Sequence, residues 1–75
     1  MENKIRIGEC VLRYRREHGL SQRELASLLG VSFQAVSKWE REVSYPDLCL
    51  LPKISTLLGI SIDEMMGLKH QRTAV

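Results

Sequence analysis

The length, composition and charge of the chain exclude several classes of protein. Its 75 residues are 44% hydrophobic and 27% charged, and a chain of this size rarely holds more than one hydrophobic core. We therefore expect one domain, neither a multi-domain enzyme nor a membrane protein, because apolar residues never continue for the roughly 18 positions of a transmembrane helix. No apolar leader is visible, so the expected location is the cytoplasm. A net charge of +2 does not by itself indicate a nucleic-acid binder.

Glycine and proline divide the chain into segments of helical length. The first helix is predicted from about residue 3 or 4 to Glu17, and Gly19 is its natural left-handed end. The second helix has the strongest start signal, because Ser21 can cap it and Glu24, three residues later, can complete a capping box. We expect this second helix to end at Gly30.

Two further helices are predicted in the second half of the chain. One opens at Pro46 and Asp47, but Pro52 lacks an amide hydrogen, so the first turn is expected to be irregular. The other is capped by Ser61 and closed by Gly67. A third helix is predicted between the first two helices and the last two. Because the β-branched and aromatic residues show no sustained period-2 alternation, the sequence predicts an all-α domain of five short helices.

The segment from residue 22 to 41 has the pattern of a helix-turn-helix. Ser32 can cap a third helix that continues to about Arg41, soon after the second helix ends. A small residue, Ala26, lies where a helix crossing at a steep angle must come close. Apolar side chains can fill the angle between the two helices: Leu25, Leu29, Val31, Val36 and Trp39. An αα-hairpin in a small bundle would explain these apolar positions equally well.

The outward face of the third helix favours the helix-turn-helix. With Val36 and Trp39 turned inward, the other side carries hydrogen-bonding groups and one aromatic ring: Phe33, Gln34, Ser37, Lys38 and Arg41. Glutamine pairs in two-pronged fashion with an adenine edge, lysine reaches guanine or a phosphate, and phenylalanine can touch a thymine methyl group. This set of side chains suits the major groove of DNA.

Catalytic and metal-binding patterns are missing from the sequence. The residues that could bind a metal lack the spacing of ligands: Cys10, His18, Cys49 and His70. No glycine-rich phosphate loop is present, so we expect neither an enzyme nor a cofactor. A cytosolic chain keeps its cysteines reduced, and Cys10 and Cys49 are predicted to be small core or boundary residues.

Several short motifs match a known family. They are IG at 7–8, GLSQ at 19–22, ELA at 24–26, LGVS at 29–32, QAVSKWE at 34–40, SYPDL at 44–48 and GIS at 59–61. Over residues 5–68 the chain resembles the Xre/Cro-like helix-turn-helix family, to which phage repressors and many small bacterial regulators belong. The resemblance implies a compact five-helix, lambda-repressor-like DNA-binding domain over residues 1–68, followed by a flexible tail over 69–75.

The resemblance also implies roles for individual residues. Gln22 corresponds to a glutamine that binds a backbone phosphate and orients the recognition helix. Phe33, Gln34 and Lys38 correspond to positions that face base edges. The remaining candidates are contacts to the DNA backbone or the edge of the groove: Arg23, Ser32, Ser37, Arg41 and Tyr45.

Other matching positions are structural or depart from the family. The family often pairs an arginine of the first helix with a glutamate near the end of the third, here Arg15 and Glu40. Glu42 stands where glycine is usual, so the turn either changes conformation or holds a non-glycine residue at positive φ. Leu12 and Leu28 stand where polar residues are common and are expected to be partly exposed.

A single recognition helix reads too few base pairs to select a site in a genome. We therefore expect a homodimer on DNA, with an approximately palindromic operator. Of the apolar residues near the carboxyl end, Ile62 and Met65 are predicted in the core, and Met66 and Leu68 at a possible dimer contact. Trp39 is predicted in the core rather than on a DNA base.

The sequence therefore predicts sequence-specific binding of double-stranded DNA that regulates transcription, most simply by repression, with residues 32–41 in the major groove. Two alternatives stay open. One is a DNA-binding antitoxin that also neutralises a toxin through its apolar carboxyl end. The other is a protein-interaction module that keeps the fold without binding DNA, and Gln22, Gln34 and Lys38 argue against it.

Overall fold

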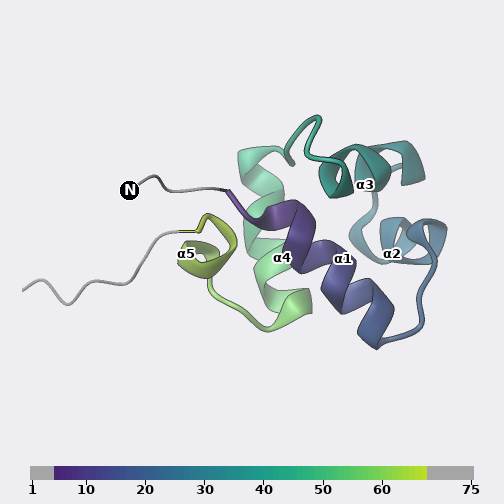
Figure 1. Ribbon diagram of the computed structural model, residues 1–75, viewed down its shortest axis with the longest axis horizontal. Helices are drawn as coiled ribbons and strands as arrows, with labels where there is room; N and C mark the ends of the chain where they lie inside the picture. The colour runs from purple at the N-terminus through teal and green to yellow at the C-terminus, as the bar shows by residue number, and fades with distance from the viewer. Residues whose placement is uncertain (1–4, 68–75) are drawn as a thin grey trace, which may run out of the picture.

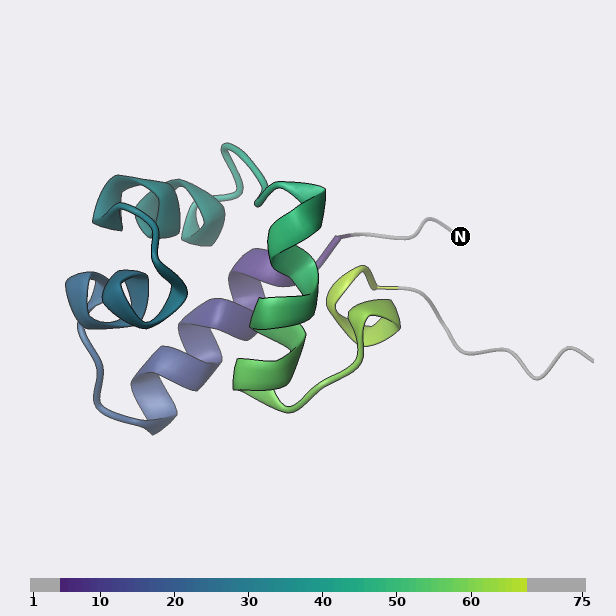
Figure 2. The ribbon, with the colours of Figure 1, turned by 180° about the vertical axis from the view of Figure 1, so that it is seen from behind.

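The computed structural model describes residues 5–67. Five α-helices and one 3-10 turn follow in chain order: α1 (Ile7–Glu17), α2 (Gln22–Leu29), α3 (Phe33–Glu40), η1 (Leu48–Leu50), α4 (Leu51–Leu58) and α5 (Ile62–Met65). Figures 1 and 2 show the fold from opposite sides. In both views α2 and α3 lie together at one end, α5 lies at the other, and α1 and α4 lie between them. The predicted all-α class with five helices is confirmed.

Short-range hydrogen bonds set the ends of α2 and α3. The Ser21 hydroxyl accepts the Glu24 amide at 3.0 Å, and the Ser21 amide donates to the Glu24 carboxylate at 2.8 Å, so the predicted capping box is confirmed. Gly30 ends α2 at a φ of +74°. Ser32 caps α3 by accepting the Ala35 amide at 3.2 Å. Each cap satisfies an amide that the first turn of a helix leaves unpaired.

The second half of the chain also follows the sequence closely. The irregular turn predicted before the fourth helix is η1, and α4 then carries Pro52 in its first turn, where a missing amide hydrogen costs no helical bond. Ser61 caps α5 by accepting the Glu64 amide at 3.0 Å. Gly67 follows with a φ of +74°. The predicted domain end at residue 68 and the tail over 69–75 lie outside the described residues.

The first helix begins later than predicted. It starts at Ile7 instead of residue 3 or 4, because Ile5 and Arg6 are not helical. The Arg6 amide donates to the Met65 carbonyl at 2.8 Å, so this segment pairs with the end of α5 instead of continuing α1. The predicted left-handed end at Gly19 is confirmed by a φ of +64°.

The hydrophobic core receives side chains from each α-helix. Its buried members are Ile7, Cys10, Val11, Leu25, Ala26, Leu29, Val36, Trp39, Leu51, Ile54 and Met65. The predictions that place Trp39 and Met65 in the core are confirmed. The prediction for Ile62 is wrong, since its side chain is 37% exposed. α5 has only four residues, and Met65 takes the position that faces inward.

The burial of two leucines and two cysteines was also predicted, and one of these four predictions is wrong. Leu28 is exposed and Leu12 is half-buried, as their departure from the family pattern predicted. Cys10 is buried, but Cys49 is exposed, which contradicts its predicted core or boundary place. Cys49 lies in the 3-10 turn, none of whose three residues is buried.

The helices α1 and α3 approach each other through a glycine. A Cβ atom on Gly8 would lie 2.0 Å from the carbonyl oxygen of Trp39, far inside contact distance. Only glycine therefore lets the backbone of α1 meet the backbone of α3 at this point. The contact fixes the third helix, which carries the predicted site, against the centre of the molecule.

Candidate nucleic-acid interface

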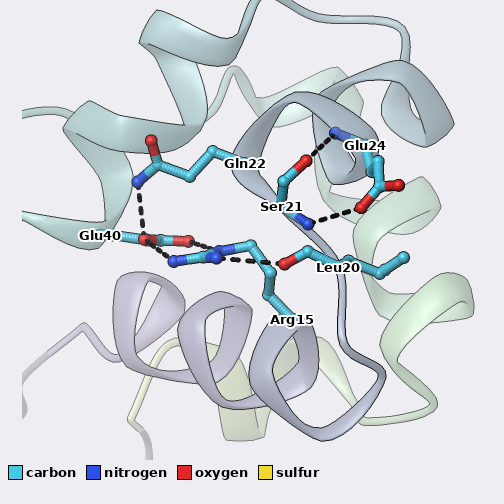
Figure 3. A network of polar contacts seen from close by, with 6 residues as sticks. All are labelled: Arg15, Leu20, Ser21, Gln22, Glu24 and Glu40. Carbon is cyan, nitrogen blue, oxygen red and sulfur yellow. Dashed lines mark hydrogen bonds and ion pairs between the residues drawn. The ribbon is translucent and has the colours of Figure 1, made fainter.

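A two-pronged ion pair ties the end of α3 to α1 (Figure 3). Arg15 Nε donates to Glu40 Oε2 at 2.8 Å, and Arg15 Nη2 donates to Glu40 Oε1 at 3.0 Å. A third donor of Arg15 reaches the carbonyl of Leu20 at 3.1 Å, in the turn before α2. The side chain of Glu40 is only 7% exposed. The pairing of Arg15 with Glu40 that the resemblance implied is confirmed.

Gln22 joins the same carboxylate from α2. Its Nε2 donates to Glu40 Oε1 at 2.9 Å (Figure 3), so one part-buried carboxylate binds side chains from two other helices. The resemblance implied that Gln22 binds a phosphate and orients the recognition helix, but Glu40 as its partner was not foreseen. The side-chain amide has two N–H groups, and only one of them donates to Glu40.

The electrostatics of the pair keep it charged. Burial by itself would raise the pKa of Glu40, but hydrogen bonds from Arg15 and Gln22 outweigh it and hold that pKa below its usual range. The hydrogen bond to Glu40 raises the pKa of Arg15. Both groups are therefore ionised at neutral pH, and the carboxyl end of α3 is held by charge-assisted bonds.

The helix α3 has one buried and one exposed side. Val36 and Trp39 are buried in the core, whereas Gln34 and Lys38 are exposed. Since the Ser32 cap holds the first turn and Glu40 the last, the exposed side chains project from a helix that is fixed at both ends. The sequence predicted this outward orientation for Gln34 and Lys38.

Two surface hollows bring most of the predicted site residues together. The first lies between α3 and the segment after it, and it contains four of them: Ser32, Gln34, Lys38 and Tyr45. Its wall also includes Ser44 and Asp47, which the sequence analysis did not assign to the site. The motif SYPDL at 44–48 was the signal that could have included them.

The second hollow lies beside the turn between α2 and α3. It contains Arg23, Ser32, Phe33 and Gln34. Phe33 was expected to face outward, but it is half-buried and packs partly against the core. The Arg23 guanidinium covers its ring, with Cζ 3.9 Å from the ring centroid.

Three predicted site residues lie outside both hollows: Gln22, which binds Glu40, Ser37 and Arg41. Ser37 is half-buried in the middle of α3, and Arg41 is exposed at its carboxyl-terminal cap. Neither lines the surface that Gln34 and Lys38 share.

The turn after α3 has a left-handed residue that is not glycine. Glu42 has a φ of +62°, which is one of the two outcomes foreseen for this position. Its amide donates to the Trp39 carbonyl at 3.0 Å, and the Val43 amide donates to the Lys38 carbonyl at 2.9 Å. These are the two bonds of a Schellman motif, which hold Glu42 in a conformation that costs about 1 kcal/mol for a non-glycine residue.

Residues 5–67 contain no cluster of three or more His, Cys, Asp or Glu side chains that could hold a metal ion. Burial raises the pKa of the Cys10 thiol, so it stays protonated and is a poor nucleophile. None of the helices between residues 5 and 67 is long and apolar enough to cross a membrane.

Comparison with known proteins places this geometry in a family. A family model described as helix-turn-helix matches residues 11–65, which include α2, the turn and α3. The chain therefore belongs to the helix-turn-helix family, as its motifs predicted.

Individual relatives agree with this assignment. The chain is 36% identical to the prophage-derived HTH-type transcriptional regulator YonR of Bacillus subtilis, over 85% of this chain and 59% of YonR. It is 35% identical to the regulator SinR of the same species, over 87% of this chain and 60% of SinR. The chain thus spans about three fifths of the length of these two relatives.

Solved structures share the fold as well. The P22 c2 repressor in complex with a synthetic operator has a TM-score of 0.73 at 32% identity, covering 80% of this chain and 91% of that one. SinR in complex with DNA has a TM-score of 0.66 at 35% identity, covering 79% of this chain and 95% of that one. The predicted repressor-like fold is therefore confirmed.

Proposed function

We propose that the protein binds double-stranded DNA at specific sequences and thereby regulates transcription, with α3 inserted in the major groove. The observation that carries the proposal is α3 itself, which is buried on the side of Val36 and Trp39, exposed on the side of Gln34 and Lys38, and anchored at its end by Glu40. The P22 c2 repressor and SinR were both solved with DNA, which supports the same role here.

The contacts divide into two groups. Phe33, Gln34 and Lys38 read base edges, because they lie on or beside the exposed side of α3. The residues around them bind phosphates and set the register without reading sequence: Gln22, Arg23, Ser32, Ser37, Arg41 and Tyr45. The proposal contains no catalytic step and no cofactor. We propose repression as the mode of action, because a protein can block an operator with its DNA-binding face alone. We also propose a cytoplasmic location, where the protein would reach such an operator.

Binding to a selected sequence tests the proposal. Sequences retained from a random DNA pool define the operator, and the affinities of the wild type, Gln34→Ala and Gln22→Ala are then compared on operator and random DNA. Gln34→Ala should cost about 1 to 3 kcal/mol at one base position and spare random DNA. Gln22→Ala should weaken both alike, because a phosphate contact carries no sequence information and Arg15 still holds Glu40 by two bonds. A loss for Gln34→Ala that is equal on both DNAs, or no enrichment of any sequence, contradicts the proposal.

We also propose that two copies bind a palindromic operator. One recognition helix selects only a few base pairs, and the end of the molecule near α5 offers an apolar hollow for a second copy. Its lining residues are Ile5, Ile7, Tyr45, Pro46, Leu48, Leu51 and Met66. Leu48 is 80% exposed. Tyr45 and Pro46 also line the hollow beside α3, so a copy bound here lies next to the DNA-facing side.

Substitution of Leu48 tests the dimer. Met66 and Leu68 were predicted from the sequence to form this contact. Met66 does line the hollow but packs partly against the core, and Leu68 lies outside the described residues. Leu48→Glu is the cleaner variant because an exposed side chain is changed. This variant should lower the affinity for the full operator and leave the affinity for a single half-site nearly unchanged. The centres of the two half-sites are expected about 10 base pairs apart. Footprints that cover one asymmetric half-site rule the dimer out.

A further inference from the structure

We propose that Arg23 and Phe33 act as one unit that recognises the 5-methyl group of a pyrimidine in the operator. Phe33 is the specificity-determining residue that touches the methyl group, and Arg23 is the positioning residue that holds the ring. This inference rests on the proposed function, and it changes the role of Arg23 from a phosphate contact to a determinant of sequence preference.

The ring of Phe33 is held in place by contacts on two sides. Phe33 is the first residue of α3, and part of its side chain packs against the core. Arg23, in the first turn of α2, places its guanidinium over the ring, with Cζ 3.9 Å from the centroid. A cation over an aromatic face is attracted by the ring quadrupole. The ring is thus held from two sides, by the core and by an exposed arginine of the neighbouring helix.

The place of Phe33 beside Gln34 determines which group of a base it would contact. Phe33 lies in the same hollow as Gln34, the next residue of α3, whose amide is suited to an adenine edge. A base beside that adenine therefore meets Phe33. In the major groove the methyl group on C5 of thymine is the apolar feature of the base edges. An apolar ring held beside Gln34 matches that group and gives no hydrogen bond to any other base edge.

Substitution by lysine separates the two roles that Arg23 could have. An arginine that only neutralises a phosphate acts through its charge, which lysine also carries. An arginine that covers a ring acts through its planar, weakly hydrated guanidinium, which lysine does not reproduce. Arg23→Lys therefore keeps a phosphate contact and disrupts the positioning of Phe33.

Single thymines in the selected operator provide the test. Deoxyuridine lacks only the methyl group, so each thymine is replaced by deoxyuridine in turn and wild-type affinity is measured. One position should lose about fourfold, the equivalent of roughly 0.8 kcal/mol for one buried carbon group. Arg23→Lys and Phe33→Ala should each bind thymine and deoxyuridine equally at that position. Arg13→Lys, a change at another exposed arginine, should keep the wild-type ratio of affinities for thymine and deoxyuridine.

The possible results separate this inference from the proposed function. Equal wild-type affinity for thymine and deoxyuridine at every position overturns the inference, and so does an Arg23→Lys variant that still discriminates. An Arg23→Lys variant that keeps the discrimination returns Arg23 to a phosphate contact, because lysine carries the same charge. If Phe33→Ala fails to fold, the Arg23→Lys result decides alone. A wild type without any sequence preference would instead refute the proposed function.

Discussion

The two ends of the molecule are held by different kinds of contact. At the end formed by α2 and α3, directional bonds add to the core: a capping box, a Schellman motif and the carboxylate of Glu40 with its two partners. At the other end, α5 is a single turn, tied through Met65 to the Arg6 amide, beside an apolar hollow with Leu48 exposed at its rim. Hydrogen bonds fix orientation, whereas apolar contacts do not.

This difference matches the two tasks proposed for the ends. A surface that reads bases must hold its side chains in place, since a small displacement breaks a two-pronged contact. A surface that receives a partner can leave apolar residues uncovered, and such exposed patches commonly mark interaction sites. Substitutions should therefore affect folding strongly at the first end and weakly at the exposed residues of the second.

The largest effect is expected at the contact between α1 and α3. Gly8→Ala forces a Cβ to within 2.0 Å of the Trp39 carbonyl oxygen, so the two helices must separate, at a cost of about 3 kcal/mol in unfolding free energy. Urea denaturation measures it. Gly59→Ala is the control, because its Cβ meets nothing within 4 Å and only its positive φ is strained, which costs about 1 kcal/mol. Similar losses for both variants would show that the crossing tolerates a side chain.

The ion pair should have the next largest effect. Arg15→Met leaves Glu40 buried with Gln22 as its main remaining partner, and we expect a loss of about 2 kcal/mol. Adding Glu40→Met should restore part of that loss, because no uncompensated buried charge is left. A double-mutant cycle of unfolding free energies checks it. Losses that simply add would mean that the two side chains are not coupled.

The lowered pKa of Glu40 predicts how that stabilisation depends on pH. The unfolded chain titrates near the ordinary value of about 4.3, and the folded pKa lies lower. The stabilisation is therefore complete above that ordinary value and is lost as the pH falls through the folded pKa. The difference in unfolding free energy between the wild type and Glu40→Gln should narrow between pH 7 and pH 3. A difference that stays constant over this range would contradict the assignment.

A smaller effect, of opposite sign, is expected at the turn after α3. Glu42→Gly relieves a φ of +62° and should raise the unfolding free energy by about 0.5 to 1 kcal/mol. Glu42→Ala removes the same charge but keeps the strain, so it should give no such gain. The two melting temperatures distinguish backbone strain from charge, and equal values would refute the strain.

The smallest effect is expected at the apolar hollow. Leu48→Ser changes a side chain that is 80% exposed and should alter the unfolding free energy by less than about 0.5 kcal/mol. Leu51→Ala, three residues later and 6% exposed, is the control and should cost at least about 2 kcal/mol. A large loss for Leu48→Ser would show that this end depends on a packed residue after all, and the contrast between the two ends would fail.

The sequence by itself determined the features that depend on neighbouring residues. The caps at Ser21 and Ser32 and the left-handed end at Gly30 were predictable, because each joins atoms no more than about four residues apart. The irregular turn before α4 followed in the same way from Pro52. The inward side of α3 followed from helical spacing alone.

The tertiary structure decided everything that depends on how the helices cross. The pairing of Arg15 with Glu40 was implied only by resemblance, and the bond from Gln22 to Glu40, 18 residues away, was not foreseen. The same holds for the guanidinium of Arg23 over Phe33. The start of α1 was predicted too early for a related reason, because the partner of its preceding amide lies near the other end of the described chain. Periodicity gives the side of a helix that faces inward, but crossing angles and backbone distances fix which atoms meet there.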